Sequence, residues 1–260
     1  MKLRHIGLGL LLGWLASGAQ AEERWQRDSY INQAFQTIAL KREYEQGSAG
    51  KLVRWDDPIR YHIVNPVKSM AKFTTLMAVH LQQLSQITGL PLQGVPLQQA
   101  NMRIFIVPQA QVDSVLIKAL GRQPFDKKIT SQAVCYGQVH LRGSTIAGAT
   151  IVIPIDNALR QSKAVDCIIE ETTQVLGLPN DSDSVFPSIF NDHSIDRYLS
   201  GLDYLLLKVL YDKRLKPGMS VPEVKTQLPA IIKDLRARGE ISQAASRVRS
   251  TGLHAYLDGS

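Results

Sequence analysis

The sequence predicts an α+β protein, in which one domain with a mixed sheet and long helices precedes a C-terminal helical appendage. Two observations predict this class. As far as residue 155, β-branched runs alternate with segments of helical periodicity, and beyond it only helical periodicity is found. Removing a predicted leader peptide leaves about 240 residues, a length that one large domain fills with a substantial core.

The first 21 residues are predicted to be a cleaved signal peptide. Lys2, Arg4 and His5 precede an apolar run, Ile6–Ala16, and small residues then end in Ala19-Gln20-Ala21. A basic head, an apolar core and an A-x-A site are what signal peptidase requires, so cleavage is expected after Ala21. The alternative is a retained membrane anchor, but the apolar run is too short to span a bilayer. We therefore expect a periplasmic or secreted protein with no transmembrane segment after cleavage.

The chain then opens with a predicted helix and a linker. Apolar residues recur with helical spacing over Arg27–Glu45, and Gly47–Gly50 breaks the pattern. An extended segment is expected over Leu52–Val64. A long amphipathic helix is expected over Pro66–Thr88, where apolar positions step by three or four until Gly89 stops it.

Three more strands and a short helix complete the predicted sheet region. The strands are expected at Met102–Val107, Ala133–Leu141 and Ile146–Ile155, with a helix over Val112–Ala119. Three helices follow, at Ala164–Leu176, Leu199–Tyr211 and Val221–Arg238. The tail after Ser242 shows little pattern. The predicted divisions are a signal peptide (1–21), an N-terminal helix and linker (22–50), the main domain (51–219) and a C-terminal helix and tail (220–260).

Charge and cysteine content limit the function classes. Losing Lys2 and Arg4 with the leader lowers the formal charge from +7 to +5, a modest excess that fits either a solvated surface or an affinity for anionic envelope polymers. Basic and aromatic residues are not interleaved, so no nucleic-acid partner is expected. Cys135 and Cys167 are the two cysteines, and export favours a disulfide over two buried thiols. This bond would tie the helix at 164–176 to the sheet.

The helix at 164–176 carries the most informative residues. Glu170 and Gln174 stand one turn apart on one face, with Cys167 one turn earlier, while Glu171 points about 100° away around the axis. Gly177 and Pro179 end the helix. The turn is expected to bring the next two residues, Asn180 and Asp181, back near the face of Glu170 and Gln174.

This layout resembles the active helix of the metzincins, the zinc peptidases in which a helix supplies two ligands at i and i+4 beside a general base. A glycine break and a third ligand follow at fixed spacing. The five positions of that frame are occupied here by Glu170, Glu171, Gln174, Gly177 and Asn180. The resemblance covers about Leu52–Tyr211 and implies a zincin-like (metzincin-like) domain.

The departures from the metzincin pattern concern the metal. All three histidine positions are replaced, by Glu170, Gln174 and Asn180, and Ser184–Ser188 stands where the methionine turn would be. Zinc prefers nitrogen and sulfur donors, so an all-oxygen set would bind it poorly and no cofactor is expected. His80, in the long helix, is expected to be a packed histidine rather than a ligand.

A second resemblance is to a proteobacterial family of exported proteins of uncharacterised function. It is carried by Glu-Glu-x-x-Gln at 170–174, by Gly-Leu-Pro-Asn-Asp at 177–181 and by Leu-Lys-Pro-Gly-Met at 215–219. The resemblance implies that the loss of the histidines belongs to the whole family. It supplies no activity.

Two functions follow as expectations. The first is a non-zinc binding protein or pseudopeptidase of the cell envelope, whose cleft holds a polypeptide or another envelope component. The second is a hydrolase in which Glu171 is the general base, either metal-free or with a hard metal ion held by Glu170, Gln174 and Asn180 or Asp181. His193, in the following loop, is a further candidate for the cleft. The plain alternative is that Glu170 and Glu171 are solvated helix residues.

Overall fold

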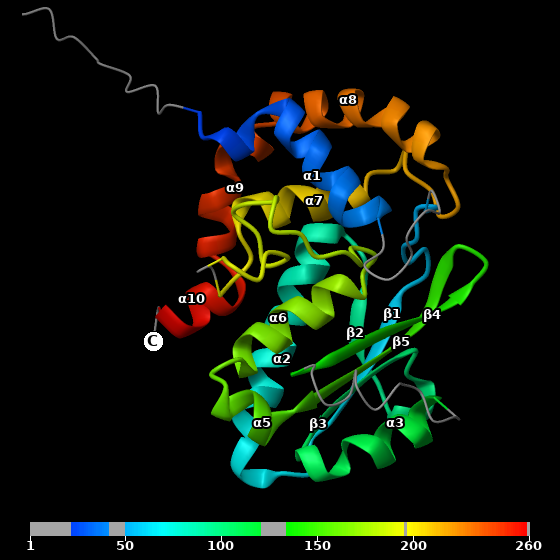
Figure 1. Ribbon diagram of the computed structural model, residues 1–260, viewed down its shortest axis with the longest axis vertical. Coiled ribbons are helices and arrows are strands. Elements are labelled where there is room, and N and C mark those ends of the chain that lie inside the picture. Colours follow the sequence, from blue (N-terminus) through cyan, green and yellow to red (C-terminus); the bar gives the residue numbers. More distant parts are fainter. Residues whose placement is uncertain (1–21, 42–49, 121–133, 195–196, 259–260) are drawn as a thin grey trace, which may run out of the picture.

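The computed structural model describes residues 22–41, 50–120, 134–194 and 197–258 (Figure 1). The predicted signal peptide and most of the predicted linker at 47–50 lie outside the described residues. Within the described residues the protein is α+β, as the sequence predicts, and the sheet is mixed. No helix in these ranges combines the length and the apolar character needed to cross a membrane.

In the described residues, five strands form one sheet in the order β2-β1-β3-β5-β4. Their bounds are Ile59–Val64 (β1), Leu92–Gly94 (β2), Met102–Val107 (β3), Tyr136–Arg142 (β4) and Thr145–Pro154 (β5). Neighbouring strands are parallel except β4, which runs antiparallel to β5 and forms one edge. The short turn at Gly143, with φ of 65°, allows this reversal.

The two faces of the sheet are covered unequally. On β5, Ile151 and Ile153 face the main core, whereas Val152 faces a second, small cluster. Helix α3 (Val112–Leu120) supplies Val112 and Leu116 to this small cluster, so it lies on the opposite face from the main core. The helices that pack on the main core include α1 (Asp28–Leu40), α2 (Ala71–Thr88), α6 (Ala164–Gln174) and α7 (Gly201–Leu210).

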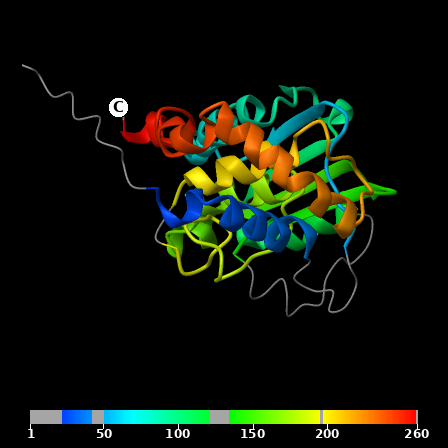
Figure 2. The ribbon, with the colours of Figure 1, turned by 90° about the horizontal axis from the view of Figure 1, so that it is seen from above.

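The C-terminal part is more helical than predicted. Helix α8 (Val221–Ala237) ends near the expected residue, but α9 (Glu240–Arg249) and α10 (Gly252–Asp258) follow it, so the prediction of an unpatterned tail was wrong. Their buried residues Ile241, Val248 and Leu253 join the main core. Helix α8 lies beside α1 and α9 beside α7, whereas α10 packs against α2 (Figures 1 and 2). The sequence also missed the three-residue strand β2 and the short helix α5 (Ile155–Arg160).

His80 connects the long helix α2 to α6 inside the core. The residue is fully buried, and its Nε2 lies 3.3 Å from the hydroxyl of Thr173 on α6. Burial lowers the pKa of His80 from 6.5 to about 4. This histidine is therefore a neutral packing residue that helps to fix α6.

The pH dependence of stability is expected to report on His80. Since the folded-state pKa of about 4 lies below the unfolded value of 6.5, the unfolded chain binds the proton more tightly, and stability falls as the pH drops from 6.5 to 4. We expect a loss of about 2.5 kcal/mol from this group by pH 4.5. Urea unfolding of the wild type and of His80→Leu, compared between pH 7 and pH 4.5, measures it. An equal pH dependence in the two proteins would contradict this assignment.

Candidate functional site

Helix α6 is held at both ends by the rest of the domain. At its start, Cys167 forms a disulfide with Cys135, which precedes β4. At its end, the carbonyl of Val175 accepts a hydrogen bond from Trp55 Nε1 at 2.8 Å, and that of Leu176 accepts one from the Tyr211 hydroxyl at 2.8 Å. These contacts satisfy carbonyls that the end of a helix leaves unpaired, so α6 is a rigid platform for its side chains.

Glu171 faces the sheet. A Cβ atom added to Gly137 of β4 would lie 2.4 Å from Glu171 Oε2, so the carboxylate occupies space that only a glycine leaves open. Glu171 is buried, and Cys167 one turn earlier is bonded to Cys135, two residues before Gly137 of β4. The structure thus places Cys167 on the face of Glu171, not on the face of Glu170 as the sequence indicated.

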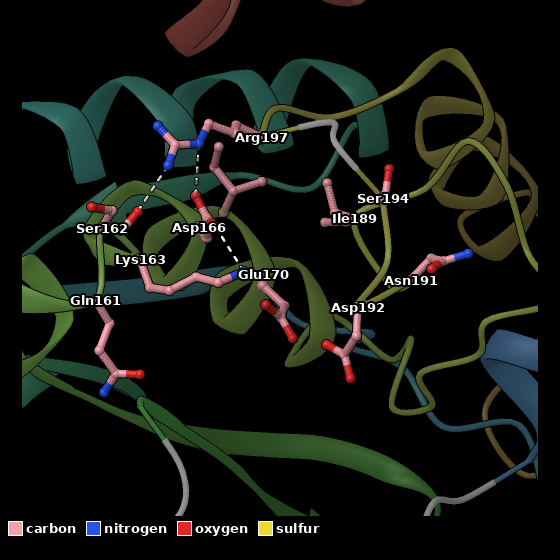
Figure 3. Close-up of a pocket in the computed structure, with 11 residues that line it drawn as sticks. Gln161, Ser162, Lys163, Asp166, Glu170, Ile189, Asn191, Asp192, Ser194 and Arg197 are labelled. Carbon is pink, nitrogen blue, oxygen red and sulfur yellow. Dashed lines mark hydrogen bonds and ion pairs between the residues drawn. The ribbon is translucent and has the colours of Figure 1, made fainter.

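Glu170 faces a pocket on another side of α6. The pocket has a volume of about 300 Å³, and Figure 3 shows Glu170 and Asp192 pointing into the same open space. Its lining residues are Gln161, Ser162, Lys163, Asp166, Ile169, Glu170, Ile189, Asn191, Asp192, Ser194 and Arg197. The sequence therefore predicted one member of this set, Glu170, as a site residue.

Charged side chains at the α6 start organise one wall of the pocket. Lys163 Nζ lies 3.1 Å from Asp166 Oδ2, and Arg197 donates to the Ser162 carbonyl at 3.0 Å (Figure 3). The Arg197 side chain also lies 3.9 Å from Asp166. One member of this wall could be predicted from the sequence: Asp166 stands four residues before Glu170 and so lies on the same face of the helix. Arg197 and Asp192 come from the segment after α6, and no pattern linked them to it.

Glu170 holds its proton unusually tightly. Burial is the main cause, and the nearby carboxylates of Asp181 and Asp192 add to it, so the pKa of Glu170 rises from 4.5 to about 8 although Lys163 opposes the shift. At neutral pH most Glu170 side chains are therefore uncharged, and each can donate a hydrogen bond to a ligand.

The Glu170→Gln variant is expected to be more stable than the wild type at pH 8. Because the folded pKa of Glu170 lies above its unfolded value of 4.5, the wild type loses stability as the pH rises from 4.5 to 8. Glutamine does not ionise and avoids this loss, which we put at about 2 kcal/mol after allowing for partial solvent exposure. Urea unfolding at pH 8 and pH 4.5 measures the difference, which should vanish at pH 4.5. A difference independent of pH would contradict the assignment.

Gln174 and Asn180 have structural hydrogen bonds. Gln174 Nε2 donates to Asp181 Oδ1 at 2.8 Å, so the turn does bring Asp181 back to the helix face. Asn180 is buried, its Nδ2 donates to the Thr37 carbonyl of α1 at 3.0 Å, and its backbone N–H donates to the carbonyl of Ile38 at 3.2 Å. Asn180 thus anchors α1 to the turn after α6.

His193 lies outside the pocket lining. Its ring Nε2 is 3.5 Å from Asp183 Oδ2, and the side chain is 80% exposed. The predicted cleft residues therefore separate into Glu170 in the pocket, Glu171 against β4, Gln174 paired with Asp181, Asn180 bonded to α1, and His193 on the surface.

A protein-family model described as "Protein of unknown function (DUF2927)" matches residues 28–230. The chain belongs to this family. No curated protein matches it. The DUF2927 match runs from the start of α1 into α8 and so contains the whole of α6 and every residue that lines the pocket, whereas α9 and α10 lie beyond it.

The side chains of Glu170, Gln174 and Asn180 do not fit a zinc ion. At the three frame positions the side chains offer a carboxyl and two amides, and the amide nitrogens of Gln174 and Asn180 already donate to Asp181 and Thr37. Zinc prefers imidazole and thiolate ligands. Among the described residues, no group of three or more His, Cys, Asp and Glu side chains is arranged to hold a metal ion.

Proposed function

We propose that this protein is a zincin-like binding protein of the cell envelope, a pseudopeptidase that holds a polypeptide in the cleft beside α6 without hydrolysing it. The proposal depends on what the side chains at two of the expected zinc-ligand positions do in the structure. Gln174 and Asn180 stand where a metzincin has zinc ligands, and both serve as structural hydrogen-bond donors. The α+β fold with a mixed sheet and the helix break at Gly177 support the zincin-like part.

The separation of the two glutamates supports binding over catalysis. Glu170 lines the pocket, whereas Glu171, the position of the general base, lies buried against Gly137 of β4. A base needs to reach the same substrate atom that the neighbouring groups polarise. Glu171 and Glu170 face different sides of α6 and do not share such a point.

The edge of the sheet supports a polypeptide ligand. In the described part of the chain, β4 pairs with β5 on one side and with no strand on the other. A free strand edge offers backbone N–H and C=O groups to an extended peptide. The pocket on α6 separately offers a carboxyl at Glu170, a carboxylate at Asp192 and a guanidinium at Arg197 for peptide side chains.

Export completes the proposal. The N-terminal pattern predicts cleavage after Ala21 and a periplasmic or secreted protein. The disulfide between Cys135 and Cys167 supports it, since such bonds persist in oxidising compartments and are rare in the cytosol.

The second candidate is a hydrolase with Glu171 as general base, metal-free or with a hard metal ion. The observation in its favour is the raised pKa of Glu170, about 8, because a carboxylic acid that keeps its proton at neutral pH is typical of acid catalysts. In this candidate a ligand-induced movement of Glu171 away from β4 is needed.

Peptide binding and peptide cleavage, measured on the same samples, test the two candidates. A fluorescein-labelled pool of random-sequence peptides is added to the purified exported protein. Fluorescence anisotropy reports binding, and mass spectrometry reports cleavage. We expect binding without cleavage, weakened in Asp192→Lys, which alters an exposed pocket residue, and unchanged in Lys225→Glu, which alters an exposed residue of α8. Cleavage that disappears in Glu171→Gln would favour the hydrolase. Absence of both binding and cleavage would refute both candidates.

A further inference from the structure

A second groove, more apolar than the first, lies on the other side of Arg197. Its volume is about 530 Å³, and its walls come from α2, from the end of α5, from the start of α6 and from α10. Helix α10 packs beside α2 at this place (Figure 1). The apolar lining includes Phe73, Leu76, Leu159, Val165, Tyr256 and Leu257.

The mouth of this groove exposes large apolar side chains. Leu159 is 38% exposed and Tyr256 is 47% exposed, whereas Phe73 and Leu76 beneath them are buried. The exposed side chains of Leu159 and Tyr256 leave apolar surface in contact with water. Such contact is unfavourable unless a ligand covers the surface. The volume falls within the range of small-molecule sites.

Two cations, Lys72 and Arg197, lie at the groove. The described lining residues include no carboxylate, although Arg197 also lies 3.9 Å from Asp166 in the neighbouring pocket. Lys72 is exposed, and its Nζ lies 5.1 Å from the centre of the Phe73 ring. Arg197 is 59% exposed and is fixed by its hydrogen bond to the Ser162 carbonyl. The groove thus combines an apolar floor with positive charge, and the complementary ligand has an apolar body and a negative group.

We propose that this groove binds an amphiphile with a single acyl chain and an anionic headgroup, of which a long-chain carboxylate is the simplest example. The chain would lie along Phe73, Leu76 and Leu159, and the headgroup would meet Lys72 and Arg197. The groove shares Ser162 and Arg197 with the α6 pocket, and its other lining residues differ. The groove also needs Tyr256 and Leu257 of α10, which lie outside residues 28–230, the part of the chain that the DUF2927 family model matches.

Calorimetric titration with dodecanoate, below its micelle concentration and with the full exported protein, tests the proposal. We expect saturable binding, weakened about fivefold by Lys72→Gln or Arg197→Gln because each removes one exposed ion pair. Leu159→Gln is expected to weaken it about tenfold through lost apolar contact. Lys72, Leu159 and Arg197 are all exposed, so the three variants are expected to fold. Circular dichroism checks that they do.

Two control variants match these changes outside the groove. Lys225→Gln on α8 removes an exposed charge, and Leu141→Gln on β4 removes an exposed apolar side chain. Both are expected to bind dodecanoate as the wild type does. Dodecanol, which lacks the charge, is expected to bind more weakly than dodecanoate. No saturable binding, equal losses in the control variants, or equal affinity for dodecanol would each overturn the proposal.

Discussion

Replacing Gly177 with alanine is expected to lower the free energy of unfolding by about 4 kcal/mol. Gly177 has φ of 118°, a conformation that side-chain-bearing residues rarely adopt, and an added Cβ would lie 2.3 Å from the carbonyl oxygen of Val53. That oxygen belongs to the backbone and cannot rotate away. Backbone strain and steric overlap therefore both destabilise the Gly177→Ala variant. Urea unfolding followed by circular dichroism measures the total loss in the free energy of unfolding.

Gly143→Ala is the matched control for this experiment. Gly143 also has positive φ, 65°, but no heavy atom lies within 4 Å of the Cβ that alanine would add. At Gly143 alanine introduces backbone strain but no steric overlap, so we expect the free energy of unfolding to fall by about 1 kcal/mol. Equal losses in the two variants would show that the close approach of Gly177 to Val53 does not matter.

Removing the disulfide by Cys135→Ala with Cys167→Ala is expected to cost about 3.5 kcal/mol. The bond joins residues 32 positions apart, and closing a loop of this length restricts the unfolded chain by about that amount. Cys167 of α6 is also buried in the core, so alanine leaves a small cavity there. The midpoint of urea unfolding measures the loss.

Reduction of the wild type supplies the control. Dithiothreitol is expected to shift the unfolding midpoint of the wild type towards that of the double variant and to leave the double variant unchanged. If dithiothreitol shifted neither protein, the disulfide would contribute nothing to stability. A loss of this size also means that the protein is most stable in an oxidising compartment, which is compatible with an exported protein.

Local signals were sufficient to predict α6. Apolar spacing over Ala164–Leu176 predicts the helix, and the structure has it at Ala164–Gln174. Gly177 predicts its end, and the positive φ at this residue supplies the physical reason. The pairing of Cys135 with Cys167 followed from compartment and cysteine number, and the structure contains the bond.

The surroundings of α6 depend on contacts between distant segments, which periodicity does not encode. Spacing shows that Glu170 and Glu171 diverge, but Gly137 decides that Glu171 packs against β4. Likewise Asn180 satisfies the frame by spacing, yet its partner is Thr37 on α1. Arg197 and Asp192 reach the pocket through the chain that follows α6.

The missed elements have weak patterns for physical reasons. Helix α9 buries Ile241, Ala244 and Val248 among many polar residues, and α10 buries one large apolar residue, Leu253. Two or three apolar residues are too few for periodicity to stand out. Strand β2 has three residues and gains its stability from pairing with β1.

The central proposal is that Glu170, Gln174 and Asn180, whose spacing resembles the ligand frame of a zinc peptidase, serve structure and binding. Its most direct test is a zinc measurement on protein purified without chelator, by elemental analysis and then by calorimetric titration with Zn²⁺. We expect no stoichiometric metal after purification and no saturable zinc binding, because Gln174 and Asn180 already donate to Asp181 and Thr37. One zinc ion per chain, lost in the Glu170→Gln variant, would contradict the account.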